Sequence, residues 1–245
     1  MRIFLAGAAG AVGRRLTPLV VAAGHAVTGT TRSPAKAPGI AAAGAEAVVV
    51  DALDGDRLRA AVMAARPDVV IHQLTDLPAT RDPATYPAAL AGNARVRILA
   101  TPNLVVAARA AGAARMITQS VAFAYAPPVH GGPCRESDPL DFAGEGNRAV
   151  LVRGVAALEA LTLGTPGLDG IVLRYAYLYG PGTWYAAPEG RGFVHVDAAA
   201  QAALLAVTRG APGTYNIAED DGAAAIDKAR RELGFDPQFL IAGAR

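Results

Sequence analysis

Hydroxyl side chains that could transfer a proton gather in two stretches of this sequence. The first is QSVAFAY, residues 119–125, which contains Ser120 and Tyr125, and the second is RYAYLYGPGTWY, residues 174–185, which contains Tyr177. A hydroxyl held within hydrogen-bond distance of a reacting oxygen can donate a proton to it. We therefore predict Ser120, Tyr125 and Tyr177 as catalytic residues. The alternative for each is a structural role, as a strand-end serine or a tyrosine at the edge of the core.

A glycine-rich turn follows the first apolar run of the chain. The run RIFLAG, residues 2–7, is typical of a buried strand, and AGAAGAVG then spaces three glycines as GxxGxxG before a predicted helix over 11–23. Glycines allow a tight turn, a close approach of the backbone to a pyrophosphate, and close packing of helix on strand. The helix N-terminus adds free N–H groups and a partial positive charge. The turn predicts a dinucleotide-binding site with contacts from Gly7, Gly10, Ala11, Val12, Gly13 and Arg14.

The residues that end the second predicted strand, HAVTGTTR (25–32), indicate which dinucleotide is bound. NAD-binding folds of this kind usually place an Asp or Glu there to hold the ribose hydroxyls, whereas this chain has Thr31, Arg32 and Ser33. No acid is present to repel a 2′-phosphate, and Arg32 and Arg14 could pair with it. We predict NADP as the preferred cofactor, with NAD as the alternative if both arginines are merely solvated.

Further cofactor contacts are predicted where the third and fourth strands end. Asp51 ends the third strand, where its carboxylate can accept a hydrogen bond from the adenine amino group or, alternatively, cap the next helix. HQLT, residues 72–75, ends the fourth strand beside the expected path of the cofactor, and we expect His72 to be packed within the strand. The remaining predicted cofactor contacts are Ala52, Leu53, Gln73, Leu74, Thr75, Gln119 and Tyr175.

Short apolar runs alternate with helical patterns along the whole chain. Near-continuous apolar strands that alternate with helices indicate a parallel sheet covered on both faces. With right-handed crossovers, the predicted fold is α/β, a doubly wound parallel sheet of the Rossmann type. The Pro- and Gly-rich segment 124–147 is expected to form a loop over the carboxyl edge of the sheet. Strands are predicted over 2–7, 25–32, 45–52, 67–75, 114–120, 170–180 and 213–219, and helices over 11–23, 56–66, 83–111 and 148–163.

Composition narrows the class of protein further. The 245 residues are 52% hydrophobic and 18% charged, which suits a packed core, and a net charge of +2 without a basic stripe argues against nucleic-acid binding. Cys134 is the only cysteine, so no internal disulfide can form, and no Cys/His cluster has metal-ligand spacing. The sequence also lacks an uninterrupted apolar run of about eighteen residues. We expect a cytoplasmic protein with a small-molecule substrate and without a metal ion, a nucleic-acid partner or a membrane partner.

Eight sequence blocks, listed at the end of this paragraph, resemble in their order and spacing the extended branch of the short-chain dehydrogenase/reductase superfamily. The resemblance covers nearly the whole chain and implies NAD(P)-dependent epimerase, dehydratase or reductase chemistry. It implies an NAD(P)-binding Rossmann domain over 1–165 and, in one continuous structural unit, a sixth strand, a late strand and a small C-terminal substrate lobe over 166–245. A homodimer through the long fourth and fifth helices is also suggested. The blocks are GAAGAVG, Asp51, HQLT, NLVVAARAAGAARMITQS, LRYAYLYGPGTWY, VHVDAAAQAALLAV, GTYNIAEDDG and KARRELGFDP.

The chain departs from the family pattern at the catalytic residues. The family's proton donor is a tyrosine that a lysine four residues later activates, and no Tyr-x-x-x-Lys occurs in this sequence. Alignment of VAALEAL with the family's helix puts Leu151 and Val155 in the places of the tyrosine and the lysine, and Val121 falls at the family's serine if Tyr125 aligns. An aliphatic side chain cannot donate a proton, whereas a nicotinamide carries the hydride chemistry itself.

These observations predict an NAD(P)-dependent oxidoreductase or epimerase with non-standard catalytic residues that acts on a small carbonyl or hydroxyl substrate. The missing tyrosine and lysine leave two alternatives open. One is an NADP-binding protein without turnover, such as a sensor or an assembly partner. The other is a non-redox isomerase or lyase on the same scaffold.

Overall fold

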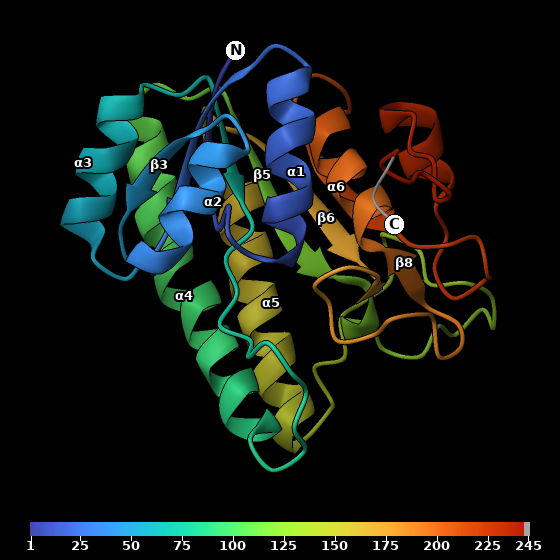
Figure 1. Ribbon diagram of the computed structural model, residues 1–245. Coiled ribbons are helices and arrows are strands. Elements are labelled where there is room, and N and C mark those ends of the chain that lie inside the picture. The colour runs from blue at the N-terminus through green and yellow to red at the C-terminus, as the bar shows by residue number, and fades with distance from the viewer. Residues whose placement is uncertain (243–245) are drawn as a thin grey trace.

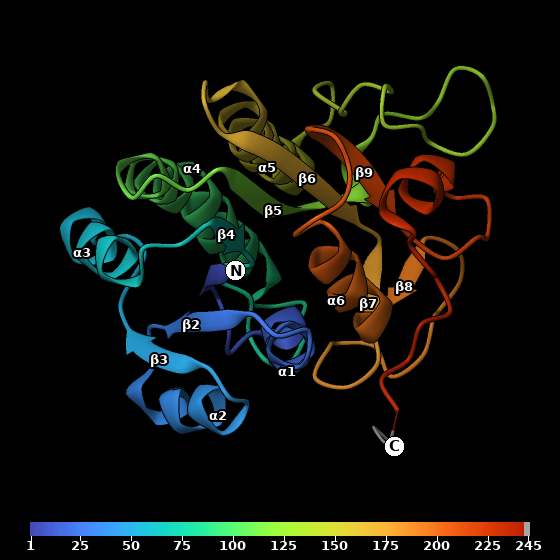
Figure 2. The ribbon, with the colours of Figure 1, turned by 90° about the horizontal axis from the view of Figure 1, so that it is seen from above.

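The computed structural model describes residues 1–242 and places a central sheet between two layers of helices (Figure 1, Figure 2). The main sheet has seven strands in the order β3-β2-β1-β4-β5-β6-β9. Neighbouring strands are parallel throughout. Because the chain starts in the middle of the sheet and winds outward in both directions, the predicted doubly wound Rossmann-type fold is confirmed.

Most elements lie where the sequence predicts them. The strands are β1 (Arg2–Ala6), β2 (Ala26–Thr31), β3 (Glu46–Val49), β4 (Val69–His72), β5 (Arg115–Val121), β6 (Asp169–Tyr175), β7 (Tyr177–Tyr179), β8 (Phe193–His195) and β9 (Gly213–Ile217). The helices are α1 (Ala11–Ala22), α2 (Ala37–Ala42), α3 (Gly55–Ala65), α4 (Tyr86–Ala110), α5 (Gly146–Gly164) and α6 (Val196–Leu205). Short 3-10 turns cover Pro34–Lys36 and Ala122–Ala124, and a π-helical turn covers Ala229–Leu233.

Alternate side chains of β1 point to opposite faces of the sheet. Ile3 and Leu5 belong to the core cluster that includes α1 and α6 residues, and Phe4 and Ala6 belong to the cluster that includes α3 and α4 residues. Because side chains alternate along a strand, a strand covered on both faces has to be apolar at every position. Figure 2 shows α3, α4 and α5 on one face of the sheet and α1, α2 and α6 on the other.

The predicted strand over 170–180 is divided in two. Up to Tyr175 it pairs with β9, but the N–H of Tyr177 donates to the Gly192 carbonyl at 2.9 Å, so the chain leaves the main sheet there. β7 and β8 then form a small parallel sheet of their own beside the carboxyl end of β6 (Figure 2). The boundary at residue 165 stays a prediction. Beyond it, β6 and β9 complete the main sheet.

The long helix α4 packs alongside α5 (Figure 1). It runs without interruption through Pro102 and leaves Ile98, Leu99 and Val106 exposed by 43%, 46% and 57%. The homodimer through these helices stays a prediction. None of the helices within residues 1–242 combines the length and the apolar character that crossing a membrane requires. A cytoplasmic location likewise stays a prediction.

Candidate active site

Backbone contacts close the glycine turn between β1 and α1 and leave no room for side chains. Gly7 adopts φ +91°, and a Cβ added there would lie 2.6 Å from the carbonyl oxygen of Gln73. A Cβ on Gly13 would overlap the backbone of Gly7 and Ala8. The first turn of α1, from Ala11, carries no acidic residue, so its N–H groups and the positive end of its dipole suit an anion. This cradle fits the pyrophosphate of a dinucleotide.

A cavity of about 290 Å³ opens beside the turn, across the carboxyl ends of β1, β2, β3 and β4. Doubly wound sheets bind ligands at this edge, where the strand order changes direction. The predicted cofactor contacts that the structure brings together in the cavity lining are Gly7, Gly10, Arg32, Asp51, Ala52, Leu53, Gln73, Leu74 and Thr75.

The other predicted contacts lie outside this lining. Val12 and Gly13 are buried where α1 packs on the turn, and Ala11 is half-buried. The exposed guanidinium of Arg14 points to Gly182, since a Cβ added there would overlap it. Tyr175 is buried and bonded to the lining residue Gln73, and Gln119 is half-buried in β5. Their contacts with a cofactor stay predictions.

Several residues that line the cavity are not among the cofactor contacts predicted from the sequence. Lys36 follows the second strand and could have been found as a further cation near Arg32. No local pattern signals the α4 residues Arg95, Val96 and Ala100, because only the tertiary packing of α4 brings them to the cavity. The missed lining residues are Ala9, Thr30, Thr31, Ser33, Lys36, Val50, Asp76, Leu77, Arg95, Val96 and Ala100.

Gln73 carries an unsatisfied acceptor at the cavity. Its Nε2 donates to the hydroxyl of Tyr175 at 3.1 Å, and the residue is only 3% exposed. Among the described residues, its Oε1 is the one buried side-chain nitrogen or oxygen without a hydrogen-bond partner. A buried polar atom without a partner costs free energy. A bound molecule that brings a donor to this oxygen would recover that cost.

Two of the three predicted catalytic hydroxyls belong to a buried polar network. Ser120 Oγ donates to Glu159 at 2.6 Å, and Arg174 donates to both oxygens of that carboxylate at 2.9 and 2.6 Å. Tyr125 donates to Asn216 at 2.7 Å, and the Arg174 guanidinium lies 4.7 Å from the centre of the Tyr125 ring. Burial raises the pKa of Tyr125 to about 12. These hydroxyls are already paired inside the protein, and their catalytic role stays a prediction.

The third, Tyr177, belongs to an aromatic wall. Its ring stacks on Phe123 with centroids 4.1 Å apart and is flanked by Tyr185 and Phe193 at 6.3 and 5.6 Å. Burial is the main cause that raises the pKa of Tyr177, although the residue is still 38% exposed. The hydroxyl of Tyr185 accepts a hydrogen bond from Arg81 at 3.1 Å. This wall, formed by Phe123, Tyr177, Tyr185 and Phe193, suits a flat apolar ring.

The segment between β4 and α4 is tied to the loop that follows β7. Trp184 donates its indole N–H to the carbonyl of Pro78 at 2.9 Å, and its ring meets Tyr86 edge-on at 6.0 Å. Together with the bond from Arg81 to Tyr185, this contact joins the cofactor side of the site to the aromatic wall.

The places that the family gives to its tyrosine and lysine are apolar and closed. Leu151 and Val155 are 7% and 0% exposed and pack in a cluster with Leu90, Val121 and Ala124. At neither place can the side chain hold or move a proton.

His72 is buried within β4, as expected. Its Nδ1 accepts from the N–H of Leu74 at 3.2 Å, and its Nε2 lies 3.1 Å from the hydroxyl of Thr101. Burial, assisted by the charge of Arg97, lowers the pKa of His72 to about 3. The imidazole is therefore neutral near pH 7.

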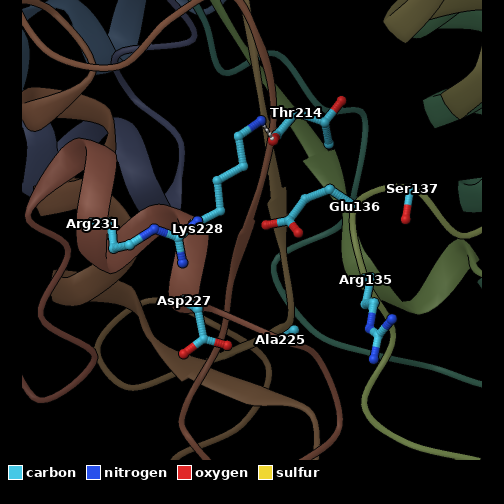
Figure 3. Close-up of a pocket in the computed structure, with 8 residues that line it drawn as sticks. All are labelled: Arg135, Glu136, Ser137, Thr214, Ala225, Asp227, Lys228 and Arg231. Atoms are coloured by element: carbon cyan, nitrogen blue, oxygen red, sulfur yellow. Dashed lines mark hydrogen bonds between the residues drawn. The ribbon is translucent and has the colours of Figure 1, made fainter.

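A second cavity, of about 570 Å³, lies beside β9 at the far edge of the sheet (Figure 3). In it Lys228 donates to the carbonyl of Thr214 at 2.9 Å, and Glu136 accepts from the N–H of Asn216 at 3.0 Å. Its lining shares no residue with the cavity at the glycine turn. The lining residues are Arg135, Glu136, Ser137, Thr214, Ala225, Asp227, Lys228 and Arg231.

The fold and the glycine cradle define a dinucleotide-binding protein of the Rossmann class. Residues 7–178 match the NAD(P)H-binding family, and the chain belongs to that family. A relative from a Streptomyces species, named 3-diazoavenalumate denitrifying reductase, is 42% identical over 268 residues, which cover 100% of this chain and 85% of the relative.

Solved structures of epimerases have the same fold. The structure of UDP-glucose 4-epimerase of Thermotoga maritima, with UDP-glucose, has a TM-score of 0.77 at 18% identity. The aligned residues cover 98% of this chain and 94% of the epimerase chain. The Bifidobacterium longum enzyme, with NAD⁺ and UDP, has a TM-score of 0.76 at 15% identity over 97% and 94% of the two chains. With the family match and the reductase relative, these similarities confirm the predicted extended short-chain dehydrogenase/reductase type, an NAD(P)-dependent oxidoreductase or epimerase.

Proposed function

We propose that this chain is an NADPH-dependent reductase that replaces the diazo group of an aromatic carboxylate with hydrogen. The observation that carries the proposal is the apolar pair Leu151 and Val155, because reduction of a carbonyl requires a proton for the product oxygen and neither side chain supplies one. The name of the Streptomyces relative describes a reductase that removes nitrogen from a diazo carboxylate. That reaction needs no proton donor.

The atoms and electrons of this reaction balance without a protein acid. When bound, the reduced nicotinamide would supply a hydride. The ring carbon of the arenediazonium gains a C–H bond with the electron pair of the hydride, while the C–N bond breaks and its electrons leave with dinitrogen. The positive charge of the diazonium and the negative charge of the hydride cancel, so both products are neutral at the reacting atoms. The buried pairing of Ser120 and Tyr125 is compatible with this chemistry, since neither hydroxyl has to give up a proton.

The residues of the aromatic wall would orient the substrate and exclude water. A ring stacked against Tyr177 and Phe123 gains burial and π contact, and the tie between Trp184 and the segment after β4 covers the same region. Water exclusion matters because an arenediazonium also reacts with water. Arg81, exposed beside Tyr185, would pair with the substrate carboxylate.

The preference for NADPH rests on the cations at the end of β2. Arg32, Ser33 and Lys36 line the cavity there and offer two positive charges and a hydroxyl to a 2′-phosphate. Replacement of Arg32 by Asp should weaken NADPH binding by roughly 1–3 kcal/mol, the value of one charge-assisted contact, and NADH binding by much less. Isothermal titration of both cofactors measures this, with Arg59→Asp on the exposed surface of α3 as the matched charge control. Equal losses for the two cofactors would reject the assignment.

The test of function is turnover with the diazonium salt of 3-amino-4-hydroxybenzoate, compared with a panel of aldehydes and ketones. We expect one NADPH consumed per 4-hydroxybenzoate and per dinitrogen formed, and negligible consumption with the carbonyl panel. Gly13→Ala, whose Cβ would overlap the backbone of the glycine turn, corrects for direct reduction of the salt by NADPH. Gly39→Ala, where a Cβ meets open space, is the matched control. Faster turnover of carbonyls would contradict the proposal. Tight NADPH binding without any turnover would favour the sensor or assembly alternative.

A further inference from the structure

Arg32 and Asp76 form an ion pair that crosses the cofactor cavity. Arg32 follows β2, Asp76 follows β4, and β1 with its glycine turn lies between these strands in the sheet. Adjacent strands lie about 4.8 Å apart, so the pair spans roughly 10 Å of the carboxyl edge. Arg32 Nη2 donates to Asp76 Oδ1 at 2.6 Å, and both residues line the cavity. A dinucleotide whose phosphates sit on the glycine turn has to pass this pair.

The two partners are not held equally. The N–H of Asp76 donates to the side chain of Asn93 at 3.2 Å, and Asn93 is 3% exposed in α4. The absence of a side chain at Gly92 leaves room for the carboxylate, since a Cβ there would lie 2.7 Å from Asp76 Oδ2. The Arg32 side chain is 62% exposed, against 34% for Asp76. When a ligand competes for this pair, Arg32 is therefore the partner that can move.

We propose that Asp76 competes with the 2′-phosphate of the cofactor for Arg32 and so sets the ratio of NADPH to NADH affinity. This inference rests on the proposed use of Arg32 by NADPH. In the free protein Asp76 holds the guanidinium. NADPH binding transfers the guanidinium to the 2′-phosphate, which offers more charge and several acceptor oxygens. NADH has no group that takes Arg32, so the pair stays in place and its affinity does not depend on Asp76.

Asp76→Asn tests the competition, because it removes the charge and keeps the shape of the side chain. We expect the dissociation constant for NADPH to fall two- to fivefold, the range of an exposed ion pair, and that for NADH to change less than twofold. Asp56→Asn, a replacement of another acid in the first turn of α3, is the matched control and should change neither constant. Thermal unfolding of the free variants shows that each one is folded.

The same substitution in an Arg32→Ala background separates competition from plain charge repulsion. Without the arginine there is nothing to compete for, so Asp76→Asn should no longer tighten NADPH binding. Equal tightening in both backgrounds would show that Asp76 merely repels the phosphate, and this would overturn the proposal. Weaker NADPH binding by Asp76→Asn alone would also overturn it, because Asp76 would then orient Arg32 for the phosphate.

The unsubstituted protein supplies the independent test of cofactor preference. If it binds NADH more tightly than NADPH, the proposed preference is wrong. The competition is still tested separately: Asp76→Asn should shift the ratio of the NADPH and NADH dissociation constants when Arg32 is present and not when it is replaced by Ala. If the protein prefers NADPH and Asp76→Asn leaves the ratio unchanged, the preference stands and the competition fails.

Discussion

The unsatisfied oxygen of Gln73 predicts that its removal has two opposite effects. The free protein should keep or gain stability against unfolding, and the affinity for NADPH should fall. Gln73 lines the cavity, its Oε1 is buried without a partner, and its Nε2 is bonded to the Tyr175 hydroxyl. A variant with Gln73→Met and Tyr175→Phe removes the side-chain amide of Gln73 together with the Tyr175 hydroxyl that it contacts, and keeps nearly the same side-chain volume. No half of the pair is then left buried alone.

The magnitudes follow from the cost of an unmade hydrogen bond. A buried polar group without a partner costs about 1–3 kcal/mol, and the lost bond between Gln73 and Tyr175 offsets about 1 kcal/mol of that gain. The free variant should therefore be as stable as the unsubstituted protein or more stable by up to about 2 kcal/mol. If a bound cofactor donates to Oε1, the variant loses about 1–1.5 kcal/mol of binding free energy, close to a tenfold higher dissociation constant for NADPH.

Urea unfolding of the free protein and calorimetric titration with NADPH measure the two effects. Tyr215→Phe is the control, since it removes another buried hydroxyl, one that donates to Glu232 far from the cavity in the chain's C-terminal part. It should lower stability and leave the affinity unchanged. If the Gln73→Met, Tyr175→Phe variant unfolds more easily and binds NADPH as before, Gln73 has a structural role and the reasoning is refuted.

Three further predictions concern the cradle, the buried network and the buried histidine. Gly13→Ala should abolish NADPH binding in a titration, because its Cβ overlaps the backbone of the turn, whereas Gly39→Ala should bind normally. Glu159→Gln leaves the Arg174 guanidinium buried without its charge partner and should lower the free energy of unfolding in urea by about 3–5 kcal/mol; a loss under 1 kcal/mol would contradict the importance of the pair. The folded-state pKa of His72 is depressed from 6.5 to about 3, so the unfolded chain takes up a proton below pH 6.5 that the folded protein cannot, and stability should fall as the pH drops from 6.5 toward 3. His72→Gln should flatten this part of the stability profile, and an unchanged profile would show that other groups cause it.

The parts of the fold that follow local rules could be predicted from the sequence. β1, the glycine turn and α1 are consecutive in the chain, and their apolar period and glycine spacing specify them without tertiary information. The strand ends that carry Arg32, Asp51 and Gln73 follow from the parallel topology, which places all carboxyl ends at one edge.

Features built from distant segments could not be predicted in this way. The bond from Ser120 to Glu159 joins β5 to α5, so the same serine that suggests catalysis in the sequence is paired in the core. Arg95 reaches the cavity only because α4 packs beside the sheet. The division of the strand after Tyr175 depends on pairing between Tyr177 and a segment around Gly192.

The central claim is that this site delivers hydride to an aromatic carbon without a proton from the protein. The most direct measurement is the source of the new hydrogen on the ring, by mass spectrometry of 4-hydroxybenzoate formed from the diazonium salt. With NADPH deuterated at the transferred position in ordinary water, the account predicts one deuterium on the ring, and with ordinary NADPH in heavy water it predicts none on that carbon. Deuterium that comes from the solvent would contradict the account, because it would require a proton donor in the site.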